Sequence, residues 1–330
     1  MVRLYARPAG FALFRWGGEY TWMTTGPVSS GVSEPLPLPT TMIGALLGTR
    51  EGAEFSEDSI LGALREKLGC RVEALRGPYY PGTRNDTIYT HLYPGRLVEL
   101  LLRDGYGVVE GVVSGVSSGY GGTALRYDRK SVARGLLYSV ELVDAAALEE
   151  RGVLPEVSMD ALGCGGCEYA SIAKLGGDMR VARLSCGDTG LLENLLESRA
   201  GARYCLVASP ILLDDRESAE KLLEGEKVEV GDCTLKPVPL ETVERLLGEA
   251  RSCMEVEKLA KQLRLRVEIL SPGVEGSTGF PREPLLAVMP GAVVECECSR
   301  EALKRGVGLY SRIGFGTLLP IKEPTGSRGE

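Results

Sequence analysis

Hydrophobic and polar positions alternate at helical spacing in two stretches near the N-terminus. The segment 56–68 places its apolar residues on one face of a helix and charged residues on the other. Those apolar residues are Ile60, Leu61, Leu64 and Leu68. A shorter apolar run, Met42–Leu47, follows Thr40 and Thr41, either of which is a good N-cap, and ends at Gly48. The pattern predicts two helices here.

Strand-like apolar runs occur in both halves of the chain, without the regular strand–helix repeat of a parallel sheet. We expect strands at 71–75, 97–103, 108–114, 135–143, 167–175, 179–185, 203–209, 265–270 and 291–298. Helices are expected at 189–198 and 240–262, whereas 214–235 is acidic and turn-rich. These elements indicate an α+β fold with helices on one face of its sheets. A boundary near 144–164 suggests two domains, 1–150 and 151–330.

Composition is that of an ordinary globular protein, with 44% hydrophobic and 25% charged residues. No apolar run reaches the roughly 20 residues that cross a bilayer, and the N-terminus has no signal-peptide pattern. We therefore expect a cytoplasmic protein without a membrane partner. Only one Gln and two Asn occur, a depletion typical of thermophiles. A net charge of −7 argues against indiscriminate nucleic-acid binding but leaves local basic patches possible.

The nine cysteines include one C-x-x-C pair, Cys164 and Cys167. A zinc ribbon needs a second pair, and Cys296-x-Cys298 has the wrong spacing. A redox motif would need a thioredoxin-like context, which the surrounding pattern lacks. Structural thiols or a local disulfide are favoured over metal or redox chemistry, and no cofactor is expected.

The most distinctive stretch is rich in glycine and lies near the C-terminus, between Leu303 and Pro320. It contains Gly306, Gly308, Gly314 and Gly316, flanked by Lys304, Arg305 and Arg312. Glycines let backbone N–H groups approach an anion closely, and the neighbouring cations would hold phosphates. No third glycine completes a dinucleotide fingerprint and no P-loop occurs. The stretch is therefore either a phosphate-backbone cradle or a hairpin with bulges.

Three further features are weaker candidates. A basic patch contains Arg126, Arg129 and Lys130, although such patches are often solvated faces. The hydroxyls of Ser29, Ser30, Thr40 and Thr41 precede the first helix, whose N-terminus could accept a phosphate. His91 is the only histidine and the only ordinary candidate for general acid–base chemistry near neutral pH. Without a partner visible in sequence, a loop or core histidine is favoured.

Three segments together resemble the RAMP superfamily of CRISPR-associated proteins. They are "PLPLPTTMIGALLG" (35–48), "ALRYDRKSVARGLLYSVELVD" (124–144), and "FPREPLLAVMPGAVVECE" (280–297) followed by "GLYSRIGFGTLLP" (308–320). The second and third segments are similar to one branch, the third subunit of the Cmr (type III-B) RNA-guided effector complex. The resemblance covers both halves, with little in 144–263.

The resemblance implies two ferredoxin-like (RRM-type) domains in tandem, with inserted loops and hairpins. It also implies a non-catalytic subunit that binds the 5′ repeat-derived handle of crRNA and contacts the large polymerase-like effector subunit and a neighbouring backbone RAMP subunit. No RRM aromatic pair is visible, so loops rather than a stacking sheet are expected to bind RNA. The expected RNA-binding residues are Arg15, Ser29, Ser30, Thr40, Thr41, Arg126, Tyr127, Arg129, Lys130, Lys304, Arg305, Gly306, Gly308, Tyr310, Ser311, Arg312, Gly314 and Gly316.

Two alternative functions belong to different classes. One is a metal-independent crRNA-processing endoribonuclease of the same superfamily, with His91 as its acid or base. The other is a small-molecule enzyme built on Cys164 and Cys167. A role on DNA has little support, because no helix-turn-helix or zinc-finger pattern occurs.

Overall fold

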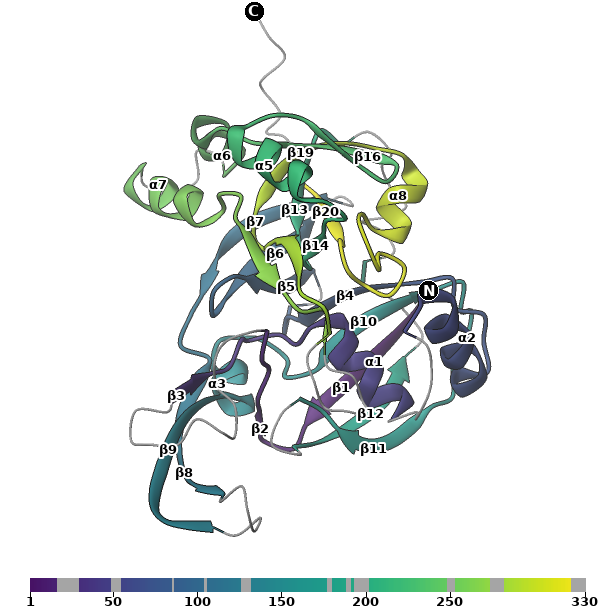
Figure 1. The fold of residues 1–330 in the computed structure, drawn as a ribbon, viewed down its shortest axis with the longest axis vertical. Coiled ribbons are helices and arrows are strands. Elements are labelled where there is room, and N and C mark those ends of the chain that lie inside the picture. The colour runs from purple at the N-terminus through teal and green to yellow at the C-terminus, as the bar shows by residue number, and fades with distance from the viewer. Residues whose placement is uncertain are drawn as a thin grey trace, which may run out of the picture.

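The structure is a computed structural model of the 330-residue chain. It describes residues 1–16, 30–48, 55–84, 86–103, 106–125, 132–176, 180–187, 191–192, 202–247, 253–273 and 282–321. These residues contain seven helices and four β-sheets, and every strand pairing except that of β3 with β9 is antiparallel (Figure 1). The expected α+β class is therefore confirmed in its broad form.

The largest sheet has eight strands in the order β11-β12-β1-β10-β4-β5-β6-β7. Their bounds are β1 Val2–Pro8, β4 Ala74–Pro81, β5 Thr87–Leu92, β6 Arg96–Arg103, β7 Tyr106–Val113, β10 Val157–Leu162, β11 Ala170–Lys174 and β12 Val181–Gly187. Strands β10, β11 and β12 thus belong to the same sheet as β1. The first sheet extends past the boundary at 150 that the sequence suggested.

One face of this sheet is covered by α1 (Pro39–Leu47) and α2 (Glu57–Leu68). Alternate residues of β1 are buried on that face, where Leu4 shares a core with Met42 and Leu64. Helix α2 forms as expected, because Ser56 caps its N-terminus and Gly69 ends it in a left-handed conformation. Its buried face includes all four predicted apolar residues.

A separate four-stranded sheet forms an arm on the first half. It consists of β2 (Phe11–Ala12), β3 (Ser30–Val32), β8 (Ser117–Leu125) and β9 (Val132–Asp144), followed by α3 (Ala145–Glu150). Strands β8 and β9 pair along most of their length and extend away from the rest of the chain (Figure 1).

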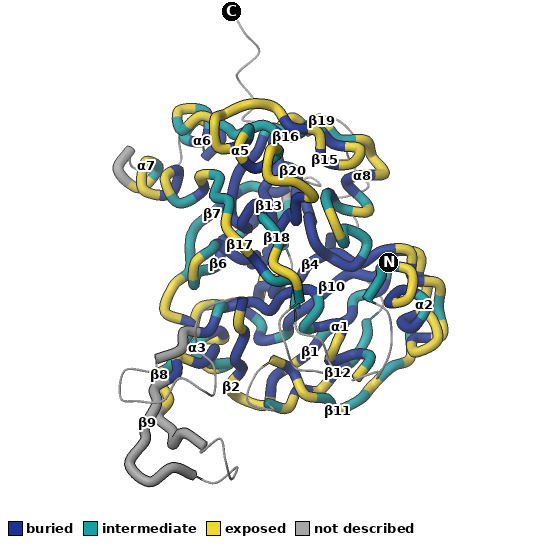
Figure 2. Tube along the Cα trace, in the orientation of Figure 1, coloured by how far each residue is buried: buried dark blue, intermediate teal, exposed yellow. Residues whose placement is uncertain are grey.

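The second half forms a five-stranded sheet in the order β15-β16-β19-β13-β20 and a three-stranded sheet in the order β14-β18-β17. The strands are β13 Tyr204–Val207, β14 Ile211–Leu212, β15 Val228–Val230, β16 Cys233–Pro237, β17 Val267–Leu270, β18 Leu285–Val288, β19 Val293–Cys298 and β20 Leu318–Pro320. The helices are α5 Arg216–Glu224, α6 Leu240–Leu247, α7 Cys253–Gln262 and α8 Arg300–Arg305. Buried residues follow the strands of both halves and continue between them, while the outer sides of the helices are exposed (Figure 2).

Several local expectations were wrong. The first helix begins at Pro39, so Thr40 and Thr41 lie inside its first turn and the N-cap is Leu38. The segment 214–235, expected to be turn-rich, contains α5 and a hairpin. The helix expected at 189–198 lies almost wholly outside the described residues and stays a prediction, since only residues 191–192 are described, as a turn.

Cys164 and Cys167 do not bond to one another. Cys164 forms a disulfide with Cys70, and Cys167 forms one with Cys186. Two more disulfides join strands of the second sheet, Cys205–Cys296 and Cys233–Cys298. The structural interpretation of the cysteines is therefore confirmed, but the local C-x-x-C disulfide was wrong. No helix of the described residues is long and apolar enough to span a membrane.

Candidate functional site

The glycine-rich loop lies between α8 and β20, and its backbone is folded tightly onto the protein. Gly308 and Gly316 both have positive φ values, 86° and 59°. A Cβ on Gly308 would lie 2.5 Å from the carbonyl oxygen of Leu212, and one on Gly316 would overlap that of Val307. These glycines are therefore required for close packing of backbone on backbone.

Most of the loop's N–H groups are hydrogen-bonded within the protein. Leu309 donates to the carbonyl of Leu212 at 2.9 Å, and Gly316 donates to that of Pro210 at 2.7 Å. Arg312 donates its backbone N–H to a carboxylate oxygen of Glu57 at 2.8 Å. The sequence suggested that the loop amides bind a phosphate. Only the few loop N–H groups without a partner inside the protein could do so.

The cations beside the loop also have carboxylate neighbours. The guanidinium of Arg312 lies 2.7 Å from Asp58, in the first turn of α2, and its side chain is 34% exposed. Arg305 pairs with Glu301 one helical turn earlier at 2.7 Å. Such exposed pairs are weak, so a phosphate could displace the carboxylates at small cost. Lys304 is half-buried in α8.

A buried arginine lies behind the loop. Arg76, on β4, is fully buried and donates from Nη1 to the carbonyls of Leu75 (2.6 Å) and Ser311 (3.3 Å). Its Nε and Nη2 have no hydrogen-bond partner. Burial and the nearby charge of Arg305 lower the pKa of Arg76 well below its usual value. The guanidinium thus ties the middle of the loop to the large sheet.

The loop meets the N-terminus of α1, the other phosphate candidate from the sequence. A Cβ on Gly314 would lie only 3.1 Å from Cβ of Pro39, the first residue of that helix. Thr40 does not offer a free hydroxyl there, because its Oγ1 donates to the carbonyl of Pro272 at 2.7 Å. Thr41 is half-buried beside it. The structure therefore brings together two segments that are far apart in sequence.

An aromatic and cationic cluster lies at this junction, and two of its members were not predicted. Phe55 packs against Tyr310 with ring centroids 5.0 Å apart, and the guanidinium of Arg282 lies 3.7 Å from the centre of the Phe55 ring. Tyr310 itself has a positive φ of 56°, unusual for a residue with a side chain. We call Thr40, Phe55, Arg282, Tyr310 and Arg312 the loop–helix surface. Phe55 and Arg282 could not be predicted from the sequence, because they are far apart along the chain and become neighbours only when it folds.

The remaining predicted residues are dispersed. Arg15 is exposed, immediately before the buried Trp16. Ser30 lies on β3, but its side chain, like Ser29 as a whole, lies outside what the structure describes. The predicted arm residues, Arg126, Tyr127, Arg129 and Lys130, also lie outside the described residues, between β8 and β9.

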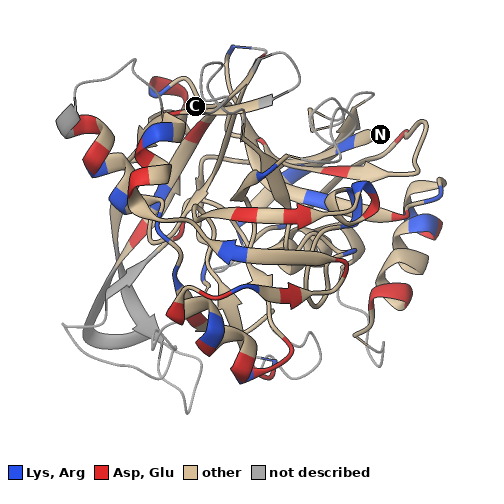
Figure 3. Cartoon of the chain, turned by 90° about the horizontal axis from the view of Figure 1, so that it is seen from above, with Lys and Arg blue, Asp and Glu red and all other residues tan. Residues whose placement is uncertain are grey.

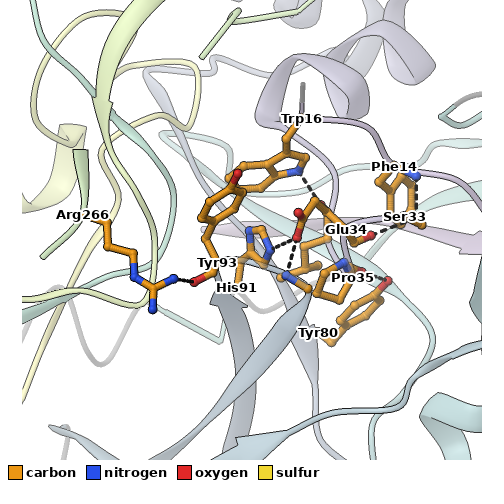
Figure 4. A network of polar contacts seen from close by, with 11 residues as sticks. Phe14, Trp16, Ser33, Glu34, Pro35, Tyr80, His91, Tyr93 and Arg266 are labelled. Carbon is orange, nitrogen blue, oxygen red and sulfur yellow. Dashed lines mark hydrogen bonds and ion pairs between the residues drawn. The ribbon is translucent and has the colours of Figure 1, made fainter. Parts of the chain in front are cut away.

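His91 lies in β5 and is 1% exposed (Figure 4). Its Nε2 atom is 2.7 Å from a carboxylate oxygen of Glu34, which also accepts the N–H of Gly95. Trp16 packs edge-on against the imidazole with centroids 4.1 Å apart. Among the described residues the histidine is enclosed by these neighbours, and the expected core role fits this geometry.

Charges of both signs are interspersed elsewhere on the molecule. On α5, Arg216 pairs with Glu220 and Lys221 with Glu217, and Figure 3 shows mixed colours over the helices of this half. Among the described residues no group of three or more His, Cys, Asp or Glu could hold a metal ion. These features define an α+β protein in which the sequence-distant glycine-rich loop and first helix meet, and whose described helices carry mixed charge.

Comparison with solved structures identifies the fold more closely. The chain is similar to a chain of the cryo-EM structure of the Type III-B Cmr-beta bound to cognate target RNA and AMPPnP. They share 17% identity and a TM-score of 0.55, and the match covers 96% of this chain and 95% of that one. A chain of the Type III-B Cmr-beta bound to cognate target RNA matches at 16% identity and the same TM-score, over 97% and 99%. No protein-family model and no curated protein sequence matches. The resemblance seen in the sequence is thus confirmed at the level of the fold.

Proposed function

We propose that this chain is a non-catalytic, RNA-binding subunit of a type III-B CRISPR effector complex. It would cap the 5′ repeat-derived handle of crRNA and contact the large polymerase-like subunit and a neighbouring backbone RAMP subunit. The observation that carries the proposal is the similarity of fold over 96% of the chain to a component of the Type III-B Cmr-beta structure.

The strand orders support the finer fold that the resemblance implies. In the first half, the neighbouring strands β12, β1, β10 and β4 have the order 4-1-3-2 of a ferredoxin-like sheet. Between β10 and β12, where that fold has its second helix, the described chain instead forms strand β11, which pairs with β12. In the second half β20-β13-β19-β16 follows the same order, and α5 and α8 occupy the two helical positions. We infer two ferredoxin-like units of the RRM type.

The loop–helix surface is the proposed contact for the handle. It combines aromatic rings, on which splayed bases could stack, with the guanidinium of Arg282 over the Phe55 ring and that of Arg312, which Asp58 holds weakly. Its loop is fixed in place by the glycine contacts and by Arg76. Handle recognition by loops then requires little reorganisation on binding.

The absence of chemistry is part of the proposal. The burial of His91 against Glu34 and Trp16 supports a structural role for the one histidine, and the bonding of Cys164 and Cys167 to other cysteines supports the same for the thiols. Cleavage assays on wild type and His91→Ala test this, because an active wild type and an inactive variant would overturn it.

The binding test compares two RNAs that differ only in the 5′ handle, by fluorescence anisotropy, with and without the large subunit. The triple variant Lys304→Ala, Arg305→Ala, Arg312→Ala should lose the preference for the handle. A matched triple, Arg216→Ala, Lys221→Ala, Lys227→Ala, removes the same charge from distant exposed ion pairs and should keep it. Equal binding of both RNAs by the wild-type protein in every combination would refute the capping role.

A further inference from the structure

The outer edge of the large sheet has a face that the loop–helix surface does not include. Residues of β11, β12 and β1 that point away from α1 and α2 lie in register: Ile172 opposite Arg183 and Arg183 opposite Arg7. The next row along the strands joins Ala170, Ser185 and Tyr5. Cross-strand neighbours of this kind are about 5 Å apart. We call these strands' outward residues the edge face.

This face is exposed. Ile172 is 75% and Val181 48% exposed, and every second residue of β11 is exposed along its whole length. On β12 the same alternation leaves Val181 and Arg183 exposed while Ala182 and Leu184 enter the core. Figures 1 and 2 show β11 at the margin of the molecule.

The edge face is basic in a chain that is acidic overall. None of β1, β11 and β12 contains an Asp or Glu, although the chain has 45 acidic and 38 basic residues. The strands carry Arg3, Arg7, Lys174 and Arg183. Such a local excess of positive charge attracts anions in spite of the net charge of the molecule.

Two of the cations lie directly opposite one another, which normally destabilises a sheet. Arg7 is offset by Glu149 at 3.1 Å and Glu156 at 3.5 Å. Arg183 has no carboxylate partner within the described part of the chain, and neither has Lys174. The two carboxylates offset the charge of Arg7 but not those of Arg183 and Lys174, which an anion bound on the edge face would neutralise.

Flat groups lie beside the cations. The guanidinium of Arg3 is 5.3 Å from the ring centre of Tyr5, and Tyr5 is half-buried on β1, the innermost strand of the face. Aromatic rings and guanidinium planes are the surfaces on which single-stranded bases stack. Protein–protein interfaces, in contrast, have an apolar centre depleted of charge. Here the centre is charged and the apolar Ile172 lies at the rim, which favours a nucleic acid over a protein.

We propose that the edge face binds single-stranded RNA outside the handle, with Arg183 and Lys174 on phosphates and Tyr5 stacked on a base. This site is additional to the loop–helix surface, lies on the sheet rather than on loops, and does not depend on recognition of a handle. No local pattern in the sequence indicates this site, because no RRM aromatic pair is present and the cations come from segments about 170 residues apart.

The test uses the full chain and a fluorescent single-stranded RNA of about twelve nucleotides without a handle, in the range that one single-strand-binding domain contacts. Anisotropy is measured over a series of salt concentrations. Lys174→Ala with Arg183→Ala should weaken binding about tenfold at low salt and reduce the slope of log K against log salt by about 1.4, as two lost phosphate contacts require. Arg216→Ala with Lys221→Ala, which removes the same charge from α5, should leave both unchanged.

Stacking gives an independent readout. Tyr5→Leu should weaken binding about fivefold or more and leave the salt slope unchanged, because it removes no charge. The proposal is overturned if the double variant matches its control in affinity and slope, or if the wild type does not bind this RNA at low salt. If the wild type binds this RNA through the edge face but shows no preference for an RNA with the 5′ handle, the capping role fails and the edge-face proposal stands.

Discussion

The Nε2 atom of His91 lies 2.7 Å from Oε2 of Glu34, and the same oxygen accepts the backbone N–H of Gly95 at 2.7 Å. Glu34 follows β3, and His91 lies in β5, so the contact fixes the entry to α1 against the large sheet. Burial raises the pKa of Glu34, but the hydrogen bond and charge of His91 and the N–H of Gly95 outweigh it, so the pKa is below its usual value.

Removing the histidine should destabilise the fold. His91→Ala leaves a largely buried carboxylate with one backbone donor, and loss of one member of such a pair typically costs about 3–5 kcal/mol. The free energy of unfolding from urea titration measures the effect. His91→Gln keeps a donor that can reach Glu34 and should cost less. Equal losses for both variants would mean that the ring packing against Trp16, not the ion pair, determines the effect.

The same pair predicts how stability depends on acid. Because the pKa of Glu34 is lower in the folded state, its contribution is present above the unfolded value near 4.5 and is lost as the pH falls through the folded value. Glu34→Gln should therefore flatten the loss of stability below about pH 4.5. An unchanged acid limb of the stability curve would contradict this.

Asp160 should make stability depend on pH in the opposite direction. Burial raises its pKa to about 6, against the hydrogen bonds from Tyr79 and from the N–H of Leu192. The folded state holds the proton more tightly than the unfolded state, so this residue's contribution falls as the pH rises from about 4 to about 6. Asp160→Asn removes that dependence.

The stability of Asp160→Asn relative to wild type should improve by roughly 2.4 kcal/mol between pH 4 and pH 7, since each unit of pKa corresponds to about 1.4 kcal/mol and part of the change already lies below pH 4. The amide cannot accept the N–H of Leu192 as well as a carboxylate does, but that cost is independent of pH. Thermal or urea unfolding over this range gives the difference. Asp232→Asn, at an exposed turn, serves as the control. A difference constant with pH would show that Asp160 stays ionised in the fold.

Local signals in the sequence explain which elements could be predicted. Helix α2 has an N-cap serine, a full apolar face and a terminal glycine, and all three signals predict the same helix. Helix α5 has the same signals in Asp215 and Gly225, but it buries only Ala219 and Leu222, and the acidic surroundings obscured them. Strand β5 could not be found by alternation, because all six of its residues, His91 among them, are buried.

The candidate site shows a different limit. The glycine content correctly indicated that the backbone near 306–316 has positive φ values and lies very close to other atoms. It does not indicate whether those atoms belong to the protein or to a ligand. For Gly316 and Gly308 the nearest atoms are the carbonyl oxygens of Val307 and Leu212. The edge face depends on the register of β1 with β12, a long-range pairing that no local pattern encodes.

Replacing two glycines by alanine should change stability in opposite directions. Gly316→Ala should be strongly destabilising, by about 2 kcal/mol or more, because its φ is positive and the added Cβ would overlap the backbone of Val307. Gly62→Ala, inside α2 with nothing within 4 Å, should stabilise by roughly 0.5–1 kcal/mol. Thermal unfolding of both variants tests the packing of the loop. A neutral Gly316→Ala would show that the loop does not pack as described.

The four disulfides predict unequal contributions to stability. Cys70–Cys164 closes 94 residues and Cys167–Cys186 closes 19, and both join segments in or next to the strands of the large sheet. In the chain-entropy model the longer loop gives about 1.4 kcal/mol more stabilisation at 25 °C. Under non-reducing conditions Cys70→Ala with Cys164→Ala should therefore lower the free energy of unfolding more than Cys167→Ala with Cys186→Ala. Repeating the urea titrations in a strong reductant supplies the control, because the wild type then loses both cross-links and the advantage of the longer loop should disappear. If the ranking is reversed while the bonds are intact, native-state packing around the sulfurs outweighs the entropy of the unfolded chain.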